Sequence, residues 1–475
     1  MIRAYPGQAS VWPGGMLALH VSTASPRFRV AFHRWADGPL LMLRSGWLAG
    51  RLAEDRDADE DWDWPMYHFE IPADWPSGVY IATLEEDGHR RSFGLARDDG
   101  AVLFVVRATG ELATKTEGRG LLYKLPLATY HAYNCTGGAC FYSKPPRSLE
   151  PPGARVSLRR PGGGIGGEVW GAPDHYDAGS PRQSFAHWDA RFIGWLARQG
   201  YEADFCTDLD IHADPDLLSR YRLLVSSGHD EYWSEPTRDA VEEFAAGGGN
   251  LAFFGANLCW WRIHIVDGGA AMVCHQGGPR GARDHWWPAN GAARPEDSLG
   301  GVSYRHGGGW WDGPRASPGY LVQQPGHWVF AGTGLARGDA LGRDTWPPLV
   351  GYECDGAPID ACAGLDDTAT PATGATSGIR TGIRLAARAH EGGTPPGYQL
   401  LAAAPLGRGW QELPPREGQA AGEGLHAATL GLFHSEGGGT VFSAGTTDWA
   451  QVLATGRDRR VEQITRNVLD TLLRR

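Results

Sequence analysis

The segment Arg222–Trp233, RLLVSSGHDEYW, indicates the fold class of this chain. Its first five residues form a mostly apolar run of strand length, and the residues that follow are mainly glycine and polar residues. A helix is expected next, because Ser234 can cap it, Pro236 can open it and the glycines at 247–249 can end it. A second apolar run follows at Leu251–Phe254. A strand, a helix and a strand in this order predict a parallel sheet with helices on its faces.

The same alternation extends to both sides of this segment. Apolar strands are predicted at Leu121–Leu125 and Tyr201–Cys206. Between them, His187–Arg198 places its large apolar side chains on one helical face. A strand at Gly439–Ala444 and an amphipathic helix at Val461–Leu473 follow near the end of the sequence. The second part of the chain is therefore expected to be an α/β domain.

The first part of the chain has a different pattern. Residues 1–112 contain short apolar runs, such as Met16–Ser22, that are separated by turns of Pro, Gly and Asp. This spacing predicts an antiparallel, Ig-like β-sandwich. A polar stretch at 111–120 is expected to link it to an α/β domain at 113–475, with β-rich insertions at about 263–435.

Composition excludes some classes of function. The 475 residues carry a formal net charge of -11 without a Lys/Arg cluster, which argues against nucleic acid as a partner. No apolar run is long enough to span a membrane, and the start lacks a signal-peptide pattern, so a cytoplasmic protein is expected. The seven cysteines form no Cys-x-x-Cys pair, which favours reduced thiols over structural zinc. The 20 tryptophans suit an apolar pocket or a large interface, and leave homo-oligomerisation open.

Chemically useful side chains follow three of the predicted strands. Open parallel sheets bind ligands at the carboxyl ends of their strands. The segments that follow strands are Thr129–Gly138, Ser227–Trp233 and Gly255–Arg262. Together they offer Tyr, His, Glu, Asn and Cys side chains, which we expect to gather at one rim.

These segments resemble a known family, that of the large (beta) subunit of N,N-dimethylformamidase. The matching stretches are Ala132-Tyr133-Asn134 with the later Gly-Gly and Phe141-Tyr142, Ser227-Gly228-His229-Asp230-Glu231-Tyr232, Gly255-Ala256-Asn257 with Trp261-Arg262-Ile263, and the early Ser10-Val11-Trp12-Pro13-Gly14. The family's large subunit is longer and has an additional lectin-like domain, for which this sequence has no room. The resemblance implies hydrolysis of the C–N bond of a small amide, and we expect the α/β domain to be glutamine-amidotransferase-like.

The resemblance also implies a mononuclear iron site. In that family one iron is held by two tyrosines and a glutamate, and the matching residues here are Tyr133, Tyr142 and Glu231. Tyr130 remains an alternative to Tyr133 because both lie in the same short stretch. Phenolate and carboxylate are hard oxygen donors that suit Fe(III). Three protein ligands leave positions for water and substrate, so that the metal can polarise an amide carbonyl.

Three further residues are candidates for the acid–base and binding steps. His229, two residues before Glu231, is suited to carry a proton to the leaving amine. Asn257 is suited to hydrogen-bond the substrate or a developing oxyanion, and Glu353 is an additional acid–base candidate. Each also has an ordinary structural interpretation, as a buried histidine, a turn former or a lone carboxylate. The family enzyme has a small partner subunit, and the sequence leaves open whether this chain needs one.

Two other functions stay open at this point. Cys259 follows a strand, as a thiol amidohydrolase would require, but lacks the Gly-x-Cys-x-Gly pattern of a nucleophile elbow. A non-catalytic carbohydrate- or protein-binding protein would use the tryptophan-rich surface instead. The glycine run Gly162–Gly167 follows Arg-Arg-Pro rather than a strand, so we interpret it as a plain loop and not as a nucleotide-binding loop.

Overall fold

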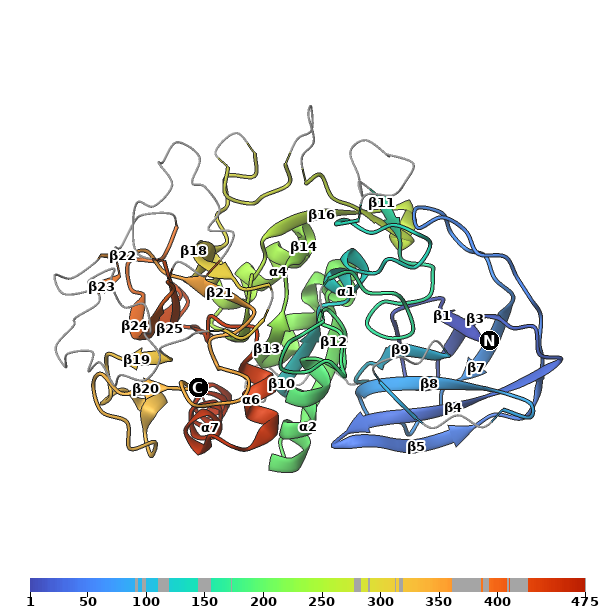
Figure 1. The fold of residues 1–475 in the computed structure, drawn as a ribbon, viewed down its shortest axis with the longest axis horizontal. Coiled ribbons are helices and arrows are strands. Elements are labelled where there is room, and N and C mark those ends of the chain that lie inside the picture. Colours follow the sequence, from blue (N-terminus) through green and yellow to red (C-terminus); the bar gives the residue numbers. More distant parts are fainter. Residues whose placement is uncertain are drawn as a thin grey trace. The chain divides into compact units, whose positions relative to one another are not determined.

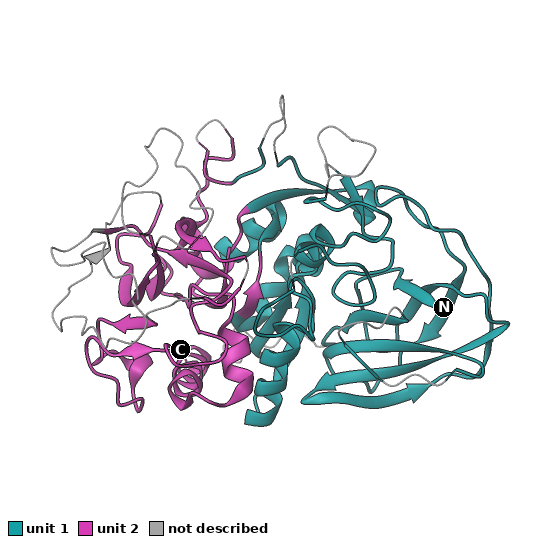
Figure 2. Ribbon diagram, in the orientation of Figure 1, with its two compact units in different colours: residues 1–224, 231–243, 261–285 teal, residues 225–230, 244–260, 286–475 magenta. Residues whose placement is uncertain are grey.

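The computed structural model describes a mixed α/β chain with several sheets (Figure 1). The described residues are 1–89, 93–95, 100–109, 119–143, 155–171, 173–276, 283–288, 291–311, 313–315, 319–360, 386–387, 393–407, 410 and 426–474. The chain divides into two compact units (Figure 2). Unit 1 comprises residues 1–224, 231–243 and 261–285, and unit 2 comprises residues 225–230, 244–260 and 286–475.

Unit 1 begins with two sheets that share one hydrophobic core. The first sheet has the order β1 (Arg3–Pro6), β3 (Met16–Ser22), β7 (Met66–Glu70). The second sheet has the order β2 (Ser10–Val11), β9 (Ala101–Val106), β8 (Gly78–Glu86), β4 (Arg27–Ala36), β5 (Gly38–Arg44). The short strand β6 (Leu48–Ala49) pairs with β4. In β3 the alternate side chains Leu17, Leu19 and Val21 are buried, and they share a core with Phe32 and Phe104 of the second sheet. The pairings are antiparallel, as predicted, except that β2 runs parallel to β9.

The later part of unit 1 has the predicted strand–helix–strand pattern. β10 (Arg119–Leu125) and β12 (Ala203–Thr207) pair in parallel, and the amphipathic helix α2 (Asp189–Gln199) lies between them in the sequence. On the other side of β10 in the sheet lies β13 (Tyr221–His229), whose first four residues belong to unit 1. This part of unit 1 also contains α1 (Leu127–Ala132), α3 (Asp208–Ala213) and the 3-10 helix η1 (Pro215–Arg220).

A separate small sheet in unit 1 carries residues that matter below. Its order is β11 (Arg155–Ser157), β17 (Ala271–Val273), β16 (Trp261–Val266), β14 (Tyr232–Ser234), and the short helix η2 (Asp267–Gly269) connects β16 to β17. β14 and β16 are parallel, whereas β16 and β17 form an antiparallel pair in which His264 lies opposite Val273. α4 (Glu235–Ala246) follows β14, and the expected helix after the segment Arg222–Trp233 is therefore present.

Unit 2 continues from β13 with a sheet that is only partly parallel. Its order after β13 is β15 (Asn250–Ala256), β26 (Thr440–Ser443), β25 (Ala427–His434), β24 (Gln399–Pro405), β19 (Tyr320–Val322), β20 (Ala340–Leu341). β15 and β26 are parallel, as predicted, but every later pair is antiparallel. The parallel arrangement expected for the α/β domain ends at β26, because a tight turn at 435–439 joins β25 to β26 and so short a connection allows only antiparallel neighbours. The other antiparallel strands, β24, β19 and β20, lie within residues 263–435, where β-rich insertions were predicted.

The predicted β-rich insertions are present where the structure describes residues 263–435. Two further sheets there pair β18 (Ser303–Gly309) with β21 (Glu353–Gly356), and β22 (Ile359–Asp360) with β23 (Ala386–Ala387). The helical elements of unit 2 are α5 (Asp297–Gly300), η3 (Trp328–Phe330), α6 (Trp449–Thr455) and α7 (Arg459–Arg474). Most of the predicted linker at 111–120 lies outside the described residues, and the predicted domain boundary at residue 112 stays a prediction.

Two expectations about the whole chain can be compared with the described residues. None of the helices found there is both long and apolar enough to cross a membrane. Six of the seven cysteines are described and carry free thiols, and Cys362 lies outside the described residues.

The closing helix α7 offers a test of the unit 2 core. Leu469 is fully buried on the apolar face of this helix, whereas the side chain of Arg466 is 40% exposed. We expect Leu469→Ala to lower the free energy of unfolding by about 2–5 kcal/mol, because the truncation leaves a cavity. Arg466→Ala should change it by less than about 0.5 kcal/mol. Urea denaturation followed by tryptophan fluorescence compares the two variants, and equal effects would contradict the packing described here.

Candidate functional site

Two tyrosines and a glutamate of unit 1 meet in a cluster in which Tyr133 and Glu231 are buried and Tyr142 is partly buried. The Tyr133 hydroxyl lies 2.8 Å from Glu231 Oε2, and the Tyr142 hydroxyl lies 2.8 Å from Glu231 Oε1. The two hydroxyl oxygens are 2.9 Å apart, and their rings are stacked with centroids 4.3 Å apart. The structure thus brings together all three residues that the sequence suggested as iron ligands. We call Tyr133, Tyr142 and Glu231 the tyrosine–carboxylate cluster.

The spacing of these oxygen atoms fits a single small cation. Neighbouring ligands of an octahedral cation with bonds of ~2.0 Å lie about 2.8 Å apart. The phenol–carboxylate distances of 2.8 Å and the phenol–phenol distance of 2.9 Å agree with that value. All of the donors are hard oxygen atoms, which Fe(III) prefers over soft ligands. The residues present therefore fit the group that the family resemblance implied.

The electrostatics favour neutral phenols at Tyr142 and at the neighbouring Tyr232. Burial, and then the charge of Glu231, raise the pKa of Tyr142 well above its usual value. The same two causes raise the pKa of Tyr232, whose hydroxyl donates to that of Tyr142 at 2.5 Å. A nearby cation reverses this effect, because it stabilises the phenolate. The cluster is thus arranged so that cation binding and phenol deprotonation would occur together.

Local structure places Tyr133 and Glu231 beside each other. Tyr133 is the C-cap of α1, the short helix that follows β10. Thr129, one helical turn earlier, accepts hydrogen bonds through its hydroxyl from the backbone N–H groups of Glu231 (3.0 Å) and Tyr232 (3.3 Å). The first helix after β10 is thereby attached to the segment that carries the carboxylate.

A buried arginine and a glycine run hold the chain around Tyr133. The guanidinium of Arg160, fully buried, donates to the carbonyl oxygens of His131, Asn134 and Thr136. Gly163 has a φ of +78°, and a Cβ atom there would lie 2.6 Å from the His131 ring. A side chain at this position would displace α1, which explains why the loop contains glycine. Gly163 in the loop Gly162–Gly167 thus has a structural purpose, because it lets the loop pack closely against α1.

Tyr130, the alternative to Tyr133, points to a different partner. Its hydroxyl donates to the carboxylate of Asp189 on α2, and the hydroxyl of Tyr123 also donates to Asp189, at 2.6 Å. All three side chains are buried. The geometry therefore associates Tyr133, and not Tyr130, with Glu231.

The other three candidate residues form a second buried cluster, in unit 2. His229 ends β13, Asn257 follows β15 directly, and Glu353 begins β21. His229 Nε2 lies 2.7 Å from Glu353 Oε2, and Asn257 Nδ2 donates to the same oxygen at 3.2 Å. We call these residues the histidine–glutamate cluster. In the sequence, only Asp230 separates His229 from Glu231.

Asp355 supports the backbone of this second cluster. Its carboxylate accepts the backbone N–H groups of Asn257 at 2.8 Å and Leu258 at 3.1 Å. Asn257 has a φ of +50°, a left-handed conformation that asparagine tolerates better than most residues. Burial raises the pKa of Asp355 to about 7, although the two N–H groups oppose this shift. Asp355 thus fixes the turn that presents the Asn257 amide to Glu353.

Sequence reasoning gave no role to several residues that the structure places in these clusters. They are Thr129, Arg160, Tyr232, Gln276 and Asp355. Tyr232 follows Glu231 directly, and its hydroxyl is hydrogen-bonded to Gln276 at 2.6 Å as well as to Tyr142. Its place inside the quoted motif was the one signal that could have identified it. Thr129, Arg160 and Asp355 act through backbone contacts and Gln276 acts through the Tyr232 hydroxyl. A sequence pattern reveals neither kind of contact.

Comparisons with known proteins identify the family of this chain. The family described as N,N-dimethylformamidase beta subunit-like, C-terminal, matches residues 31–463. Two similar relatives are the N,N-dimethylformamidase beta subunits of Alcaligenes sp and Paracoccus aminophilus, each 32% identical over 78 residues. These 78 residues make up 16% of this chain, and the alignment spans only 10% of each relative's length. The match over most of the chain shows that the protein belongs to the N,N-dimethylformamidase beta subunit-like family.

Proposed function

We propose that this chain is an iron-dependent hydrolase of small amides and that Tyr133, Tyr142 and Glu231 hold a mononuclear Fe(III). The observation that carries the proposal is the convergence of two phenol oxygens and both carboxylate oxygens at 2.8–2.9 Å. When bound there, Fe(III) would supply Lewis acidity toward an amide carbonyl and lower the pKa of water. The names of the two relatives suggest an N,N-dialkylated formamide as the first substrate to test.

In this proposal His229, which lies two residues before Glu231 in the sequence, is the proton-transfer residue, and Glu353 is its partner. His229 Nε2 lies 2.7 Å from Glu353 Oε2, close enough for a proton to pass between the two side chains. His229 is therefore suited to accept a proton from the attacking water and to deliver it to the amine nitrogen as the C–N bond breaks. Asn257 keeps Glu353 in place through its amide.

Several finer features belong to the same proposal. We assign the two sheets at the start of unit 1 to an Ig-like sandwich and the β10–β12–β13 part to a glutamine-amidotransferase-like arrangement. The relatives are named as beta subunits, so a small partner subunit is proposed for this chain as well. A homo-oligomer is compatible with this assembly. We do not propose a thiol amidohydrolase, because Cys259 is fully buried.

Tyrosine substitutions test the ligand assignment. We expect Tyr133→Phe to weaken iron binding at least ~10-fold and to reduce the visible phenolate-to-iron charge-transfer absorption, because one oxygen donor is lost. Tyr130→Phe is the matched control, since Tyr130 lies three residues earlier and bonds to Asp189 instead. It should keep both the iron and the absorption band. Iron titration monitored by visible spectroscopy separates the two, and the reverse pattern would make Tyr130 the ligand.

A further inference from the structure

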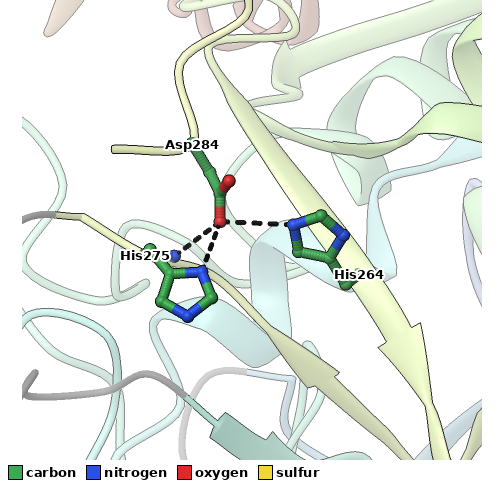
Figure 3. A group of neighbouring side chains, drawn as sticks. All are labelled: His264, His275 and Asp284. Atoms are coloured by element: carbon green, nitrogen blue, oxygen red, sulfur yellow. Dashed lines mark hydrogen bonds and ion pairs between the residues drawn. The ribbon is translucent and has the colours of Figure 1, made fainter. Parts of the chain in front are cut away.

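A second group of side chains in unit 1 converges without belonging to either cluster above (Figure 3). His264 lies on β16, His275 lies two residues after the end of β17, and Asp284 lies in the described segment 283–288. His275 Nδ1 is 2.9 Å and His264 Nε2 is 3.4 Å from the same Asp284 oxygen, Oδ2. One donor atom from each residue lies within 4.8 Å of the donor atoms of the other two.

We propose that His264, His275 and Asp284 bind a divalent transition-metal ion, with Zn²⁺ as the first candidate. Two imidazole nitrogens and one carboxylate oxygen are the mixed donor set that such ions prefer, whereas phenolates suit Fe(III). Tetrahedral zinc with bonds of ~2.0–2.1 Å places neighbouring ligands about 3.3 Å apart. The distances of 2.9 Å and 3.4 Å lie on either side of that value. The site is therefore chemically distinct from the tyrosine–carboxylate cluster.

The carboxylate of this group is held in position before any metal binds. The backbone N–H of Asp284 donates to the His275 carbonyl at 2.7 Å, and the backbone N–H of His275 donates to Asp284 Oδ2 at 2.8 Å. Arg262 Nη2 lies 3.4 Å from the other carboxylate oxygen. Hydrogen bonds and ion pairs to the ligand residues orient the ligands of metal sites in proteins in the same way. Although burial opposes ionisation, hydrogen bonds from His264 and His275 hold the pKa of Asp284 well below its usual range.

The histidines are open to the solvent, whereas the carboxylate is not. The side chains of His264 and His275 are 43% and 39% exposed, and that of Asp284 is 6% exposed. A metal ion can thus reach the group from solution and keep water on its remaining positions. Because the ligands come from β16, from the end of β17 and from the segment after it, a bound ion would cross-link three pieces of chain beside the small sheet. We infer a stabilising role for this ion.

The competing interpretation is that both imidazoles only donate hydrogen bonds to Asp284. Titration of the full chain with Zn²⁺ alone, by isothermal calorimetry, decides between them. The comparison uses the wild type, His264→Ala, His275→Ala, the exposed-histidine control His89→Ala and Glu231→Ala. The last variant identifies zinc that enters the tyrosine–carboxylate cluster instead. Removing either exposed imidazole leaves the core intact, and circular dichroism checks that each variant is folded.

Our proposal predicts one Zn²⁺ per chain with a Kd below ~10 μM. Affinity should fall at least ~10-fold in His264→Ala and His275→Ala, and stay unchanged in His89→Ala and Glu231→Ala. Zinc in 100-fold excess over Kd should also raise the Tm of the wild type by roughly 3 °C, and not that of His264→Ala. The absence of zinc binding in the wild type, equal binding in His264→Ala, or loss of binding in Glu231→Ala would each overturn the proposal.

Discussion

Glu231→Ala is expected to abolish iron binding and, with it, amide hydrolysis. The Glu231 carboxylate contacts both phenols of the cluster at 2.8 Å, so its removal separates the two tyrosines from their common partner. Losing the anionic donor also leaves a trivalent cation with too little negative charge to bind in a buried site. We expect iron per chain to fall below about one tenth of the wild-type value. Turnover of N,N-dimethylformamide should fall below detection in parallel.

The matched control for this substitution is Glu235→Ala. Glu235 carries the same charge, lies four residues later at the start of α4 and is exposed. Its truncation should leave iron content and activity within about twofold of the wild type. Metal analysis after reconstitution and a dialkylamine-release assay give the two readouts. If Glu231→Ala kept its iron, Glu231 would not be a ligand, and the cluster would be an ordinary buried hydrogen-bond network.

Disrupting the histidine–glutamate cluster is expected to slow the reaction without removing iron. General acid–base groups contribute typically 10²–10⁴-fold in rate, and we expect His229→Ala to lower kcat by an amount in this range. Glu353→Gln should lower it by at least ~10-fold, because an amide cannot exchange a proton with His229 as a carboxylate can. Iron content and the visible spectrum should stay close to those of the wild type in both variants.

A double variant makes this prediction sharper. His229 and Glu353 are 2.7 Å apart, so their contributions should not be additive. His229→Ala/Glu353→Gln should therefore have nearly the kcat of His229→Ala alone. His434→Ala, which removes an exposed histidine of unit 2, is the control and should retain full activity. Additive losses, or a loss of iron in His229→Ala, would show that the two residues do not act as one proton-transfer pair.

The sequence predicted the elements around the site better than it predicted the sheet that they belong to. The apolar run at Arg222–Ser226 indicated a strand, but β13 continues through His229 because its polar end is buried as well. Hydrophobic patterns identify strands by their apolar residues, so a buried polar end is missed. The antiparallel pairings of β24, β25 and β26 depend on contacts within a region rich in Gly and Pro, where strand signals were weak.

The candidate residues were found by motif, whereas their grouping required the structure. Tyr130 and Tyr133 lie three residues apart, a spacing that places helical residues on the same side, so periodicity could not separate them. The structure separates them because α1 ends at Ala132, before Tyr133. No local pattern could show that Glu353 lies beside His229, since 123 intervening residues separate them in the sequence.

The most direct test of the central claim is the metal content and visible spectrum of the purified, iron-reconstituted protein. The tyrosine–carboxylate cluster predicts about one iron per chain and a phenolate-to-iron charge-transfer band that is lost in Glu231→Ala and weakened in Tyr133→Phe. A colourless protein that takes up no iron on reconstitution would contradict the iron site and the amide hydrolysis proposed from it.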